Sequence, residues 1–188
     1  LRSSDRSFSS PEQRNLMALP PQTAPGAAFD LIGDLHGHAA ALRTLLADWG
    51  YVPDAGGVPR HPAGRRVLFV GDYVDRGPEI VATLRLVRGM VEAGQAIALM
   101  GNHEFNAVAL DHVVDGRPLR GANKRYQHKA TIDQLAAAGE DRGAWLEWFR
   151  TLPLWHEEAG FRVVHACWDA RHHAVLRAGR PDGRLRPA

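Results

Sequence analysis

Short apolar runs, each ending at a glycine followed by polar residues, constrain the fold of this chain more than any other feature. Such runs occupy residues 28–32, 67–70 and 96–100, and two stretches with a helical pattern separate them, residues 39–49 and 78–93. A proline opens the second helical stretch and a glycine follows each of them, as is common at helix boundaries. The strand–helix–strand–helix–strand order predicts βαβ units and a parallel sheet.

The rest of the chain shows weaker patterns. A loop rich in Gly and Pro is expected over residues 53–66, and helices are expected over residues 103–114, 126–138 and 143–151. A polar loop is expected after the first of these helices. Strand candidates at residues 154–157 and 161–164 flank an Ala-Gly pair, which predicts a β-hairpin.

Length and composition indicate one globular domain with two flexible ends. The chain has 188 residues, with 45% hydrophobic and 23% charged side chains, which is ordinary for a globular protein. Residues 1–27 are rich in Ser, Pro, Gln and Arg without any period and are interpreted as a flexible leader. We expect the domain over residues 28–176. Residues 177–188 are interpreted as a solvated basic tail rather than a nucleic-acid patch, so nucleic acid is not an expected partner.

Composition also restricts the location and the kind of site. No apolar run approaches the roughly 20 residues that a membrane helix needs, and the N-terminus lacks a signal-peptide pattern. The single cysteine, Cys167, excludes an internal disulfide and an all-cysteine metal cage, and it suits a reducing, cytoplasmic location. Its spacing to Arg171 does not match a cysteine-phosphatase loop, so Cys167 is expected to be a buried small hydrophobe.

Polar side chains follow each expected strand at the point where it ends. They are Asp34 and His36, then Asp72, Asp75 and Arg76, then Asn102 and His103, and finally His165 after the last strand. Ligands bind outside the carboxyl ends of the strands in open α/β sheets. The sequence therefore predicts one site at this edge, although His165 alone also fits a hydrogen-bonded core histidine.

The residue types indicate a metal centre with hydrolytic chemistry. Carboxylate, imidazole and amide ligands without thiolate suit Mn, Fe or Zn. A carboxylate can bridge two ions about 3.5–4 Å apart, which activate water as a hydroxide nucleophile and stabilise the leaving oxygen. Arg76 offers a planar fork for phosphate oxygens. His103 can protonate a leaving alkoxide if Asp75 orients it.

Three ordered motifs carry a resemblance to a known family. Asp34-x-His36, Gly71-Asp72-x-x-Asp75-Arg76-Gly77 and Gly101-Asn102-His103-Glu104 together resemble the calcineurin-like metallophosphoesterase superfamily. The spelling is most similar to its Ser/Thr protein phosphatase and symmetrical diadenosine tetraphosphatase branches. The resemblance covers residues 29–169.

The resemblance implies a fold and a set of roles. The implied fold is α/β, with two β-sheets packed face to face, helices outside and the second sheet incomplete. Asp34 and His36 would bind the first metal, Asp72 would bridge, and Asn102 and His165 would bind the second. His103 would be the general acid, Asp75 its partner and Arg76 the phosphate clamp. Two metal ions are implied, with Mn preferred over Fe or Zn.

One departure from the family pattern concerns the C-terminal part. Family members continue into a strand and a Gly-His-x-His-like motif that adds one histidine to each metal, and nothing after His165 matches it. His172 and His173 follow within a few residues and are candidate substitutes. The expectation from the sequence is a domain truncated at its C-terminus, with an exposed sheet edge.

Several aromatic and histidine side chains have more than one interpretation. Trp145, Trp148 and Phe149 lie at helical spacing and are expected in the core. Trp155 and Trp168 are candidates for stacking a base. His128 fits a substrate-facing residue or a solvated helix face equally well.

Three functions remain open from the sequence. The first is a phosphomonoesterase of the protein-phosphatase type, in which a metal-bridging hydroxide attacks without a covalent intermediate. The second is a dinucleoside polyphosphate hydrolase, and the third is a non-catalytic metal- or phosphate-binding fragment. The expected partners are a phosphorylated small molecule, a nucleotide or a phosphoprotein, and no membrane. The sequence leaves the oligomeric state open.

Overall fold

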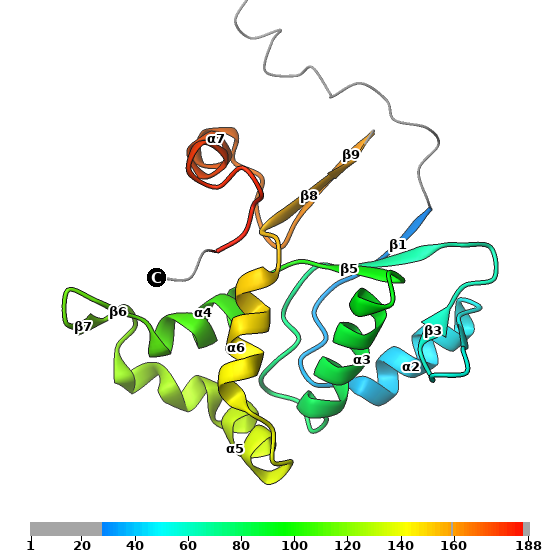
Figure 1. The fold of residues 1–188 in the computed structure, drawn as a ribbon, viewed down its shortest axis with the longest axis horizontal. Helices are drawn as coiled ribbons and strands as arrows, with labels where there is room; N and C mark the ends of the chain where they lie inside the picture. Colours follow the sequence, from blue (N-terminus) through cyan, green and yellow to red (C-terminus); the bar gives the residue numbers. More distant parts are fainter. Residues whose placement is uncertain (1–27, 159, 186–188) are drawn as a thin grey trace, which may run out of the picture.

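A three-stranded parallel sheet forms the centre of the fold in the computed structural model, which describes residues 28–158 and 160–185 (Figure 1). Its strands, in spatial order, are β1 (Phe29–Ile32), β4 (Arg66–Phe69) and β5 (Ala96–Ala98), and both pairs are parallel. The predicted parallel sheet is confirmed. The predicted leader, residues 1–27, lies outside the described residues.

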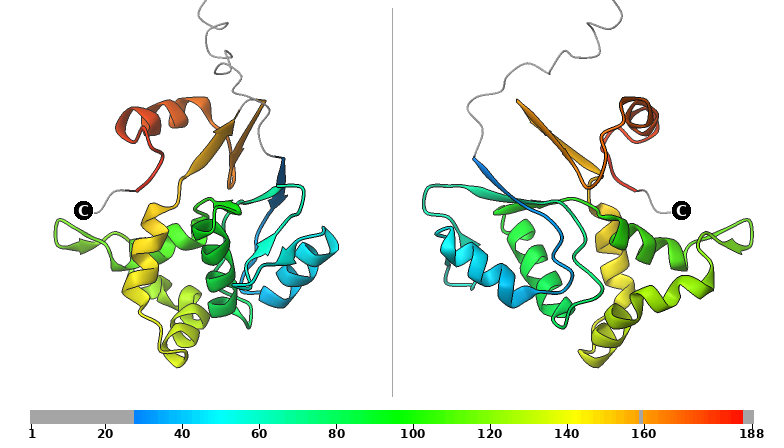
Figure 2. Two further views of the ribbon diagram at one scale, coloured as in Figure 1. Left: turned by 45° about the vertical axis from the view of Figure 1, so that its right-hand side comes forward. Right: turned by 180° about the vertical axis from the view of Figure 1, so that it is seen from behind.

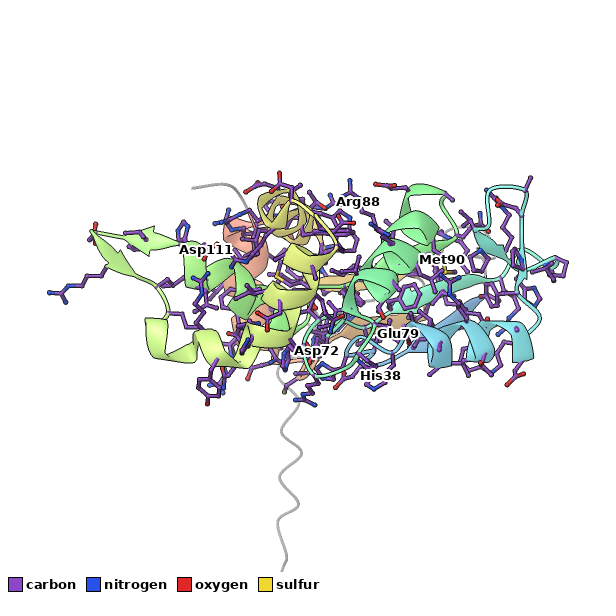
Figure 3. The ribbon with its side chains drawn as sticks, turned by 90° about the horizontal axis from the view of Figure 1, so that it is seen from below. His38, Asp72, Glu79, Arg88, Met90 and Asp111 are labelled. Atoms are coloured by element: carbon purple, nitrogen blue, oxygen red, sulfur yellow. The ribbon has the colours of Figure 1, made fainter. Side chains whose placement is uncertain are left out.

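Two helices cover one face of this sheet, α2 (Ala39–Asp48) and α3 (Ile80–Glu92). Ile80, Leu84 and Val87 lie on one stripe of α3 and are fully buried in the main core. Apolar residues at this spacing form a single helix face, which here packs against the sheet. His38 and Glu79 precede the N-terminal ends of α2 and α3 and are labelled in Figure 3. The Glu79 carboxylate accepts a hydrogen bond from Ala40 N, in the first turn of α2, at 2.9 Å.

A mainly helical segment, residues 102–151, joins β5 to the hairpin and lies beside α3 (Figure 1). It contains α4 (Asn102–Asp111), the 3-10 helix η1 (Ala122–His128), α5 (Lys129–Ala137) and α6 (Arg142–Thr151). The expected core side chains on α6, namely Trp145, Trp148 and Phe149, are all buried. We refer to residues 102–151 as the helical segment.

A β-hairpin covers the opposite face of the parallel sheet (Figure 2). It consists of β8 (Trp155–Glu158) and β9 (Phe161–Val164), which pair antiparallel. Leu68, Leu99 and Val163 form a small cluster there, separate from the main core. Neighbouring strand residues point to opposite faces, so Leu68 faces the hairpin while Val67 and Phe69 face the helices. The predicted arrangement of two facing sheets with helices outside is confirmed.

Several boundaries differ from the sequence prediction. The predicted loop 53–66 overlaps a short antiparallel pair, β2 (Val52–Pro53) with β3 (Pro59–Arg60). The predicted helix 103–114 ends at Asp111, and β6 (Val113–Val114) pairs with β7 (Arg117–Pro118). Asp115 and Gly116 between them both have positive φ, the conformation that two-residue hairpin turns require.

The C-terminal part contains a helix that the sequence analysis did not predict, α7 (Ala170–Gly179). The Asp169 carboxylate caps it by accepting from Arg171 N and His172 N. The predicted boundary between domain and tail, at residue 176, thus falls inside α7. After α7 the chain returns toward the hairpin, where Leu154 N donates to Gly183 O at 2.7 Å. None of the described helices is both long and apolar enough to cross a membrane.

Candidate metal centre

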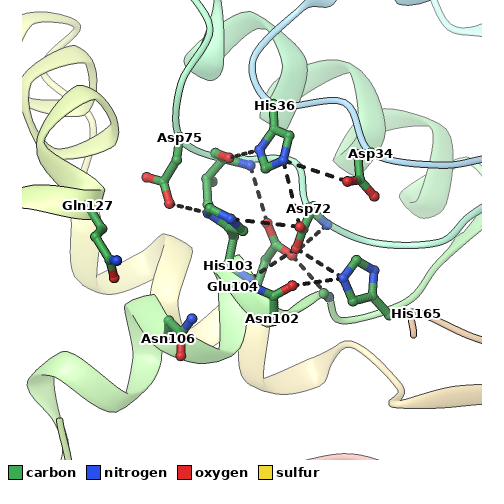
Figure 4. A network of polar contacts seen from close by, with 12 residues as sticks. Asp34, His36, Asp72, Asp75, Asn102, His103, Glu104, Asn106, Gln127 and His165 are labelled. Atoms are coloured by element: carbon green, nitrogen blue, oxygen red, sulfur yellow. Dashed lines mark hydrogen bonds and ion pairs between the residues drawn. The ribbon is translucent and has the colours of Figure 1, made fainter. Parts of the chain in front are cut away.

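Six polar side chains from separate segments converge beyond the carboxyl ends of the parallel strands (Figure 4). They are Asp34 and His36 after β1, Asp72 after β4, Asn102 and His103 at the start of α4, and His165 after β9. The converging His and Asp groups are His36–Asp72–His103 and Asp34–Asp72–His165, with ligand atoms within 4.8 Å of one another. Asp72 is common to both groups.

The two oxygens of Asp72 face different partners. Oδ2 lies 3.7 Å from His36 Nε2, whereas Oδ1 lies 3.5 Å from His165 Nε2. Such a carboxylate can bridge two cations. We therefore distinguish a first candidate position, on the His36 side of Asp72, from a second candidate position, on the side of His165 and Asn102; Asp34 lies near both, 3.8 Å from His36 Nε2 and in one group with His165.

Both histidines present the same ring nitrogen to the centre. His36 Nδ1 donates to Val74 O at 2.8 Å, and His165 Nδ1 donates to Val70 O at 2.9 Å. A carbonyl only accepts, so the proton is on Nδ1 and Nε2 carries the free lone pair. This orientation by backbone carbonyls is typical of metal-binding histidines.

The donor set fits a divalent cation. His36 Nε2 is buried without a hydrogen-bond partner, although carboxylate oxygens of Asp34 and Asp72 lie 3.8 and 3.7 Å away. These distances are too long for hydrogen bonds, and a buried lone pair facing two carboxylates leaves their mutual repulsion uncompensated. A cation between them would satisfy all three groups.

Unusual backbone conformations shape the loop that carries Asp72. Asp72, Asp75 and Arg76 have φ values of 58°, 69° and 70°, in the left-handed region that non-glycine residues rarely adopt. Gly71 allows this loop to approach the next one, because a Cβ on Gly71 would lie 2.5 Å from the Cα of Gly101. The two loops therefore touch backbone to backbone.

Glu104 holds these two loops together. Its carboxylate is fully buried and accepts from the backbone N–H groups of Asp72, Tyr73 and Val74 at 2.9, 2.8 and 3.3 Å. It also accepts from Gly101 N at 3.0 Å. Burial raises the pKa of the Glu104 carboxyl in spite of these donors. The sequence analysis noted Glu104 only as the last letter of a motif and assigned it no role.

Asp75 and His103 form the expected dyad. His103 Nδ1 lies 2.6 Å from Asp75 Oδ2, and His103 Nε2 lies 3.9 Å from Asp72 Oδ2. The hydrogen bond to the Asp75 carboxylate raises the pKa of His103. The imidazolium form thus carries a proton on Nε2 beside the candidate metal positions, as a general acid requires.

Two further side chains contact Asp75, and the sequence analysis did not assign either to the site. His128 Nδ1 lies 2.7 Å from Asp75 Oδ2, and the Thr131 hydroxyl donates to Asp75 Oδ1. His128 is 2% exposed, so the interpretation as a solvated helix face is wrong. Burial alone would raise the pKa of the Asp75 carboxyl, but the contacts with His103, His128 and Thr131 outweigh it and hold that pKa well below its usual range.

Arg76 lies at the rim of the same loop with an exposed side chain. Among the side chains that the structure describes, none accepts a hydrogen bond from its guanidinium or pairs with it. The guanidinium is therefore available to an anion at the edge of the centre.

The C-terminal histidines lie away from Asp72. His173 packs against the rings of Trp155 and Trp168, with centroids 4.5 and 4.0 Å apart, and the side chain of His172 is 86% exposed. Neither belongs to the converging groups of the described residues. Cys167 is exposed, which contradicts its expected burial, because it follows β9 at the surface.

A cavity of about 540 Å³ opens beside the second position. Asn102 and His165 form the side toward the centre, and Phe105, Trp155, Trp168 and Leu176 are among its apolar walls. The two tryptophans considered for base stacking thus lie next to the candidate metal centre.

Comparisons with known proteins place the chain in a family. A family model described as calcineurin-like phosphoesterase matches residues 28–174. The chain is 37% identical over 156 residues to a symmetrical bis(5'-nucleosyl)-tetraphosphatase of Methylococcus capsulatus, covering 81% of this chain and 48% of that protein. It is 33% identical over 145 residues to the asymmetrical bis(5'-nucleosyl)-tetraphosphatase PrpE of Halalkalibacterium halodurans, covering 73% and 56%.

A solved structure shares the fold at low identity. The cold-active protein-tyrosine phosphatase of a psychrophilic Shewanella species superposes with a TM-score of 0.52 at 19% identity, covering 84% of this chain and 51% of that one. The chain spans about half the length of the curated relatives it matches. Since the family model matches most of the chain, this protein belongs to the calcineurin-like phosphoesterase family.

Proposed function

We propose that this chain carries the two-metal centre of a hydrolase that splits dinucleoside polyphosphates. The observation that carries the proposal is the placement of Asp72, whose two oxygens face His36 on one side and His165 on the other. Mn is the proposed metal, with Fe or Zn as alternatives, because the ligands are carboxylate, imidazole and amide groups. Relatives named as bis(5'-nucleosyl)-tetraphosphatases support the substrate class.

The protein side chains have separable tasks in this proposal. Asp34, His36, Asp72, Asn102 and His165 would hold the two ions, which when bound supply an activated water and neutralise phosphate charge. Arg76 binds a phosphate oxygen at the rim. As the bond from phosphorus to the leaving oxygen breaks, the proton on His103 Nε2 moves to that oxygen, and the Asp75 carboxylate keeps the ring oriented.

The apolar cavity beside the second position supports a nucleotide substrate. Trp155 and Trp168 give the cavity aromatic walls against which a base can pack, and base–aromatic stacking contributes about 1–3 kcal/mol per base in single-strand binding proteins. His165 borders both the cavity and Asp72. A base in the cavity would thus place its phosphates at the centre.

A phosphomonoester is the second candidate substrate, because of the Asp75–His103 dyad. The dyad raises the pKa of His103 and supplies a general acid, which an alkoxide leaving group needs more than a nucleotide does. This observation supports the phosphatase interpretation, so the experiment below includes phosphomonoesters.

The test compares substrates on the chain loaded with Mn. Diadenosine tetraphosphate, p-nitrophenyl phosphate and a phosphoserine peptide are incubated separately, and the nucleotide products are resolved by anion-exchange chromatography. We expect diadenosine tetraphosphate to be hydrolysed fastest and to yield two molecules of ADP, as the name of the symmetrical relatives indicates. AMP with ATP would support asymmetrical cleavage instead. Faster hydrolysis of the peptide would favour the phosphatase, and a chain that binds no metal under excess Mn would refute both.

A further inference from the structure

Asp75 is held by the helical segment as well as by His103. We propose that His128 is a positioning residue for the general acid: it fixes the Asp75 carboxylate so that His103 Nδ1 always faces an acceptor. This inference rests on the proposed role of His103 as the acid. It concerns a residue that touches neither a candidate metal position nor the leaving group.

The contacts of Asp75 are divided between its two oxygens. Oδ2 lies 2.6 Å from His103 Nδ1 and 2.7 Å from His128 Nδ1, while Oδ1 accepts from the Thr131 hydroxyl. The same hydroxyl oxygen accepts from Asp75 N at 3.0 Å. Asp75 is completely buried, so water cannot replace a lost contact. Without His128, only Thr131 and His103 would restrain the rotation of the carboxylate.

The two histidines that share Oδ2 differ in what surrounds their other nitrogen. His103 Nδ1 donates to Oδ2, whereas the 2.7 Å contact of His128 Nδ1 with the same oxygen lacks hydrogen-bond geometry. His128 Nε2 is also buried without a partner and the residue is 2% exposed, so the ring is enclosed beside the carboxylate and limits its movement. His103 Nε2 faces Asp72 and the open centre, so the ring of His103, and not that of His128, faces the candidate metal positions.

The residues that contact the Asp75 loop lie on one face of the continuous segment formed by the end of η1 and by α5. His128, Thr131 and Gln134 are three residues apart, and residues at this spacing lie on the same side of a helix. Gln134 accepts from Ile80 N at 2.8 Å and donates to Gly77 O at 2.9 Å. These three residues thus contact the loop that carries Asp75 near both of its ends. This loop contains the left-handed residues, which persist only where the surroundings hold them.

The experiment uses the full chain loaded with Mn and two substrates that differ in leaving group. His128→Phe keeps a ring at this place and removes the polar contact with Asp75, whereas His128→Asn retains a polar N–H near the position of Nδ1. We expect His128→Phe to slow hydrolysis of phenyl phosphate about 10-fold more than hydrolysis of p-nitrophenyl phosphate, a part of the roughly 10²–10⁴-fold contribution of general acids. His128→Asn should restore most of this difference. Lys129→Ala, an exposed change on the same turn, is the control.

The Asp75 background separates positioning from general loss of structure. In Asp75→Asn, adding His128→Phe should produce no further change in the ratio of the two rates, because the carboxylate through which His128 acts is gone. Equal losses on both substrates, or an undiminished effect in Asp75→Asn, would overturn the inference. If His128→Phe does not fold, Thr131→Val takes its place with the same expected ratio and the same overturning result.

A spectroscopic readout does not require activity. In the ¹⁵N-labelled chain, the exchangeable Nδ1 proton of His103 should resonate far downfield, because it forms a hydrogen bond with a buried carboxylate. His128→Phe and Thr131→Val should shift the His103 signal, whereas Lys129→Ala should not, and an unshifted signal in both variants would overturn the inference. If His103→Asn shows no dependence on leaving group, the acid role itself fails. A dependence in His103→Asn but not in His128→Phe refutes only the inference.

Discussion

The two faces of the parallel sheet are covered very differently. The face toward α2 and α3 belongs to the main core, which also includes buried side chains of α4, α5 and α6. The opposite face is covered by the β8–β9 hairpin, and its buried cluster consists of Leu68, Leu99 and Val163. One side of the molecule is thus stabilised by extensive burial and the other by a small contact.

This difference divides the candidate metal centre. Asp34, His36, Asp72 and Asn102 lie on loops anchored by the main core and by Glu104, whereas His165 follows β9 on the thinly packed side. His165 is oriented by Val70 O, which accepts from Nδ1 at 2.9 Å, and its Nε2 lies 3.0 Å from Asn102 Oδ1. The first position therefore lies on the side of the main core, and the second position depends on the placement of the hairpin. The two positions should therefore lose metal independently of each other, except in variants of Asp72 or of Glu104, which holds the Asp72 loop.

Asp72→Asn should have the largest effect, because it should remove metal binding at both positions. An amide at this place loses the negative charge that faces both His36 and His165, so the loss should exceed the roughly 10–100-fold reduction in metal affinity typical of outer-shell changes. Elemental analysis after chelator treatment and reloading with Mn should find neither ion. Asp133→Asn, at an exposed site, is the matched control. Retention of one ion would show that Asp72 does not bridge.

His103→Asn should come next and should leave both positions intact. The variant removes the proton donor, so hydrolysis of phenyl phosphate should fall by about 10²–10⁴-fold, with a much smaller loss on p-nitrophenyl phosphate. Metal content should equal that of the unmodified chain. A variant that loses metal in proportion to activity would make His103 a ligand, as its place beside His36 and Asp72 also allows.

Glu104→Gln should destabilise the two loops that Glu104 holds together, and with them the side of the molecule that contains the main core. The amide NH₂ group would face backbone N–H donors, and unsatisfied buried donors cost about 1–3 kcal/mol. The Tm should fall, and the affinity for Mn should decrease at both positions together, as measured by calorimetry. Glu92→Gln, on the exposed face of α3, should change neither quantity. A normal Mn affinity in Glu104→Gln would mean that the two loops keep their spacing without the carboxylate.

The smallest expected effect separates the two faces directly. Val163→Ala and Val87→Ala remove the same atoms from the hairpin cluster and from the main core, and each should lower the free energy of unfolding by about 1–2 kcal/mol. Only Val163→Ala should weaken the second position, so a Mn titration followed by electron paramagnetic resonance should show one ion binding less tightly. Equal titrations for both variants would contradict the dependence on the hairpin.

Local patterns were sufficient to predict the sheet and the residues around Asp72. The expected ligands before His165 each follow a strand of the parallel sheet, so the parallel order brings them to one edge, whereas His165 follows β9 of the hairpin. His128 and Thr131 could not be found in this way, because they reach Asp75 across 53 and 56 residues of sequence from a helix whose polar stripe looks solvated. The helix α7 was missed because few of its residues are apolar, although Asp169 before it is a common N-cap residue.

Gly71 and Gly101 have a consequence for how this fold can diverge. Their contact sets the separation between Asp72 and Asn102 through main-chain atoms, which are the same in every amino acid. Residues in the surrounding core can therefore be exchanged over many generations without altering that separation, whereas any side chain at Gly71 would widen it. Outward-facing residues of the helical segment are free of this constraint. A lineage can thus change what its members recognise while the separation between Asp72 and Asn102 stays constant.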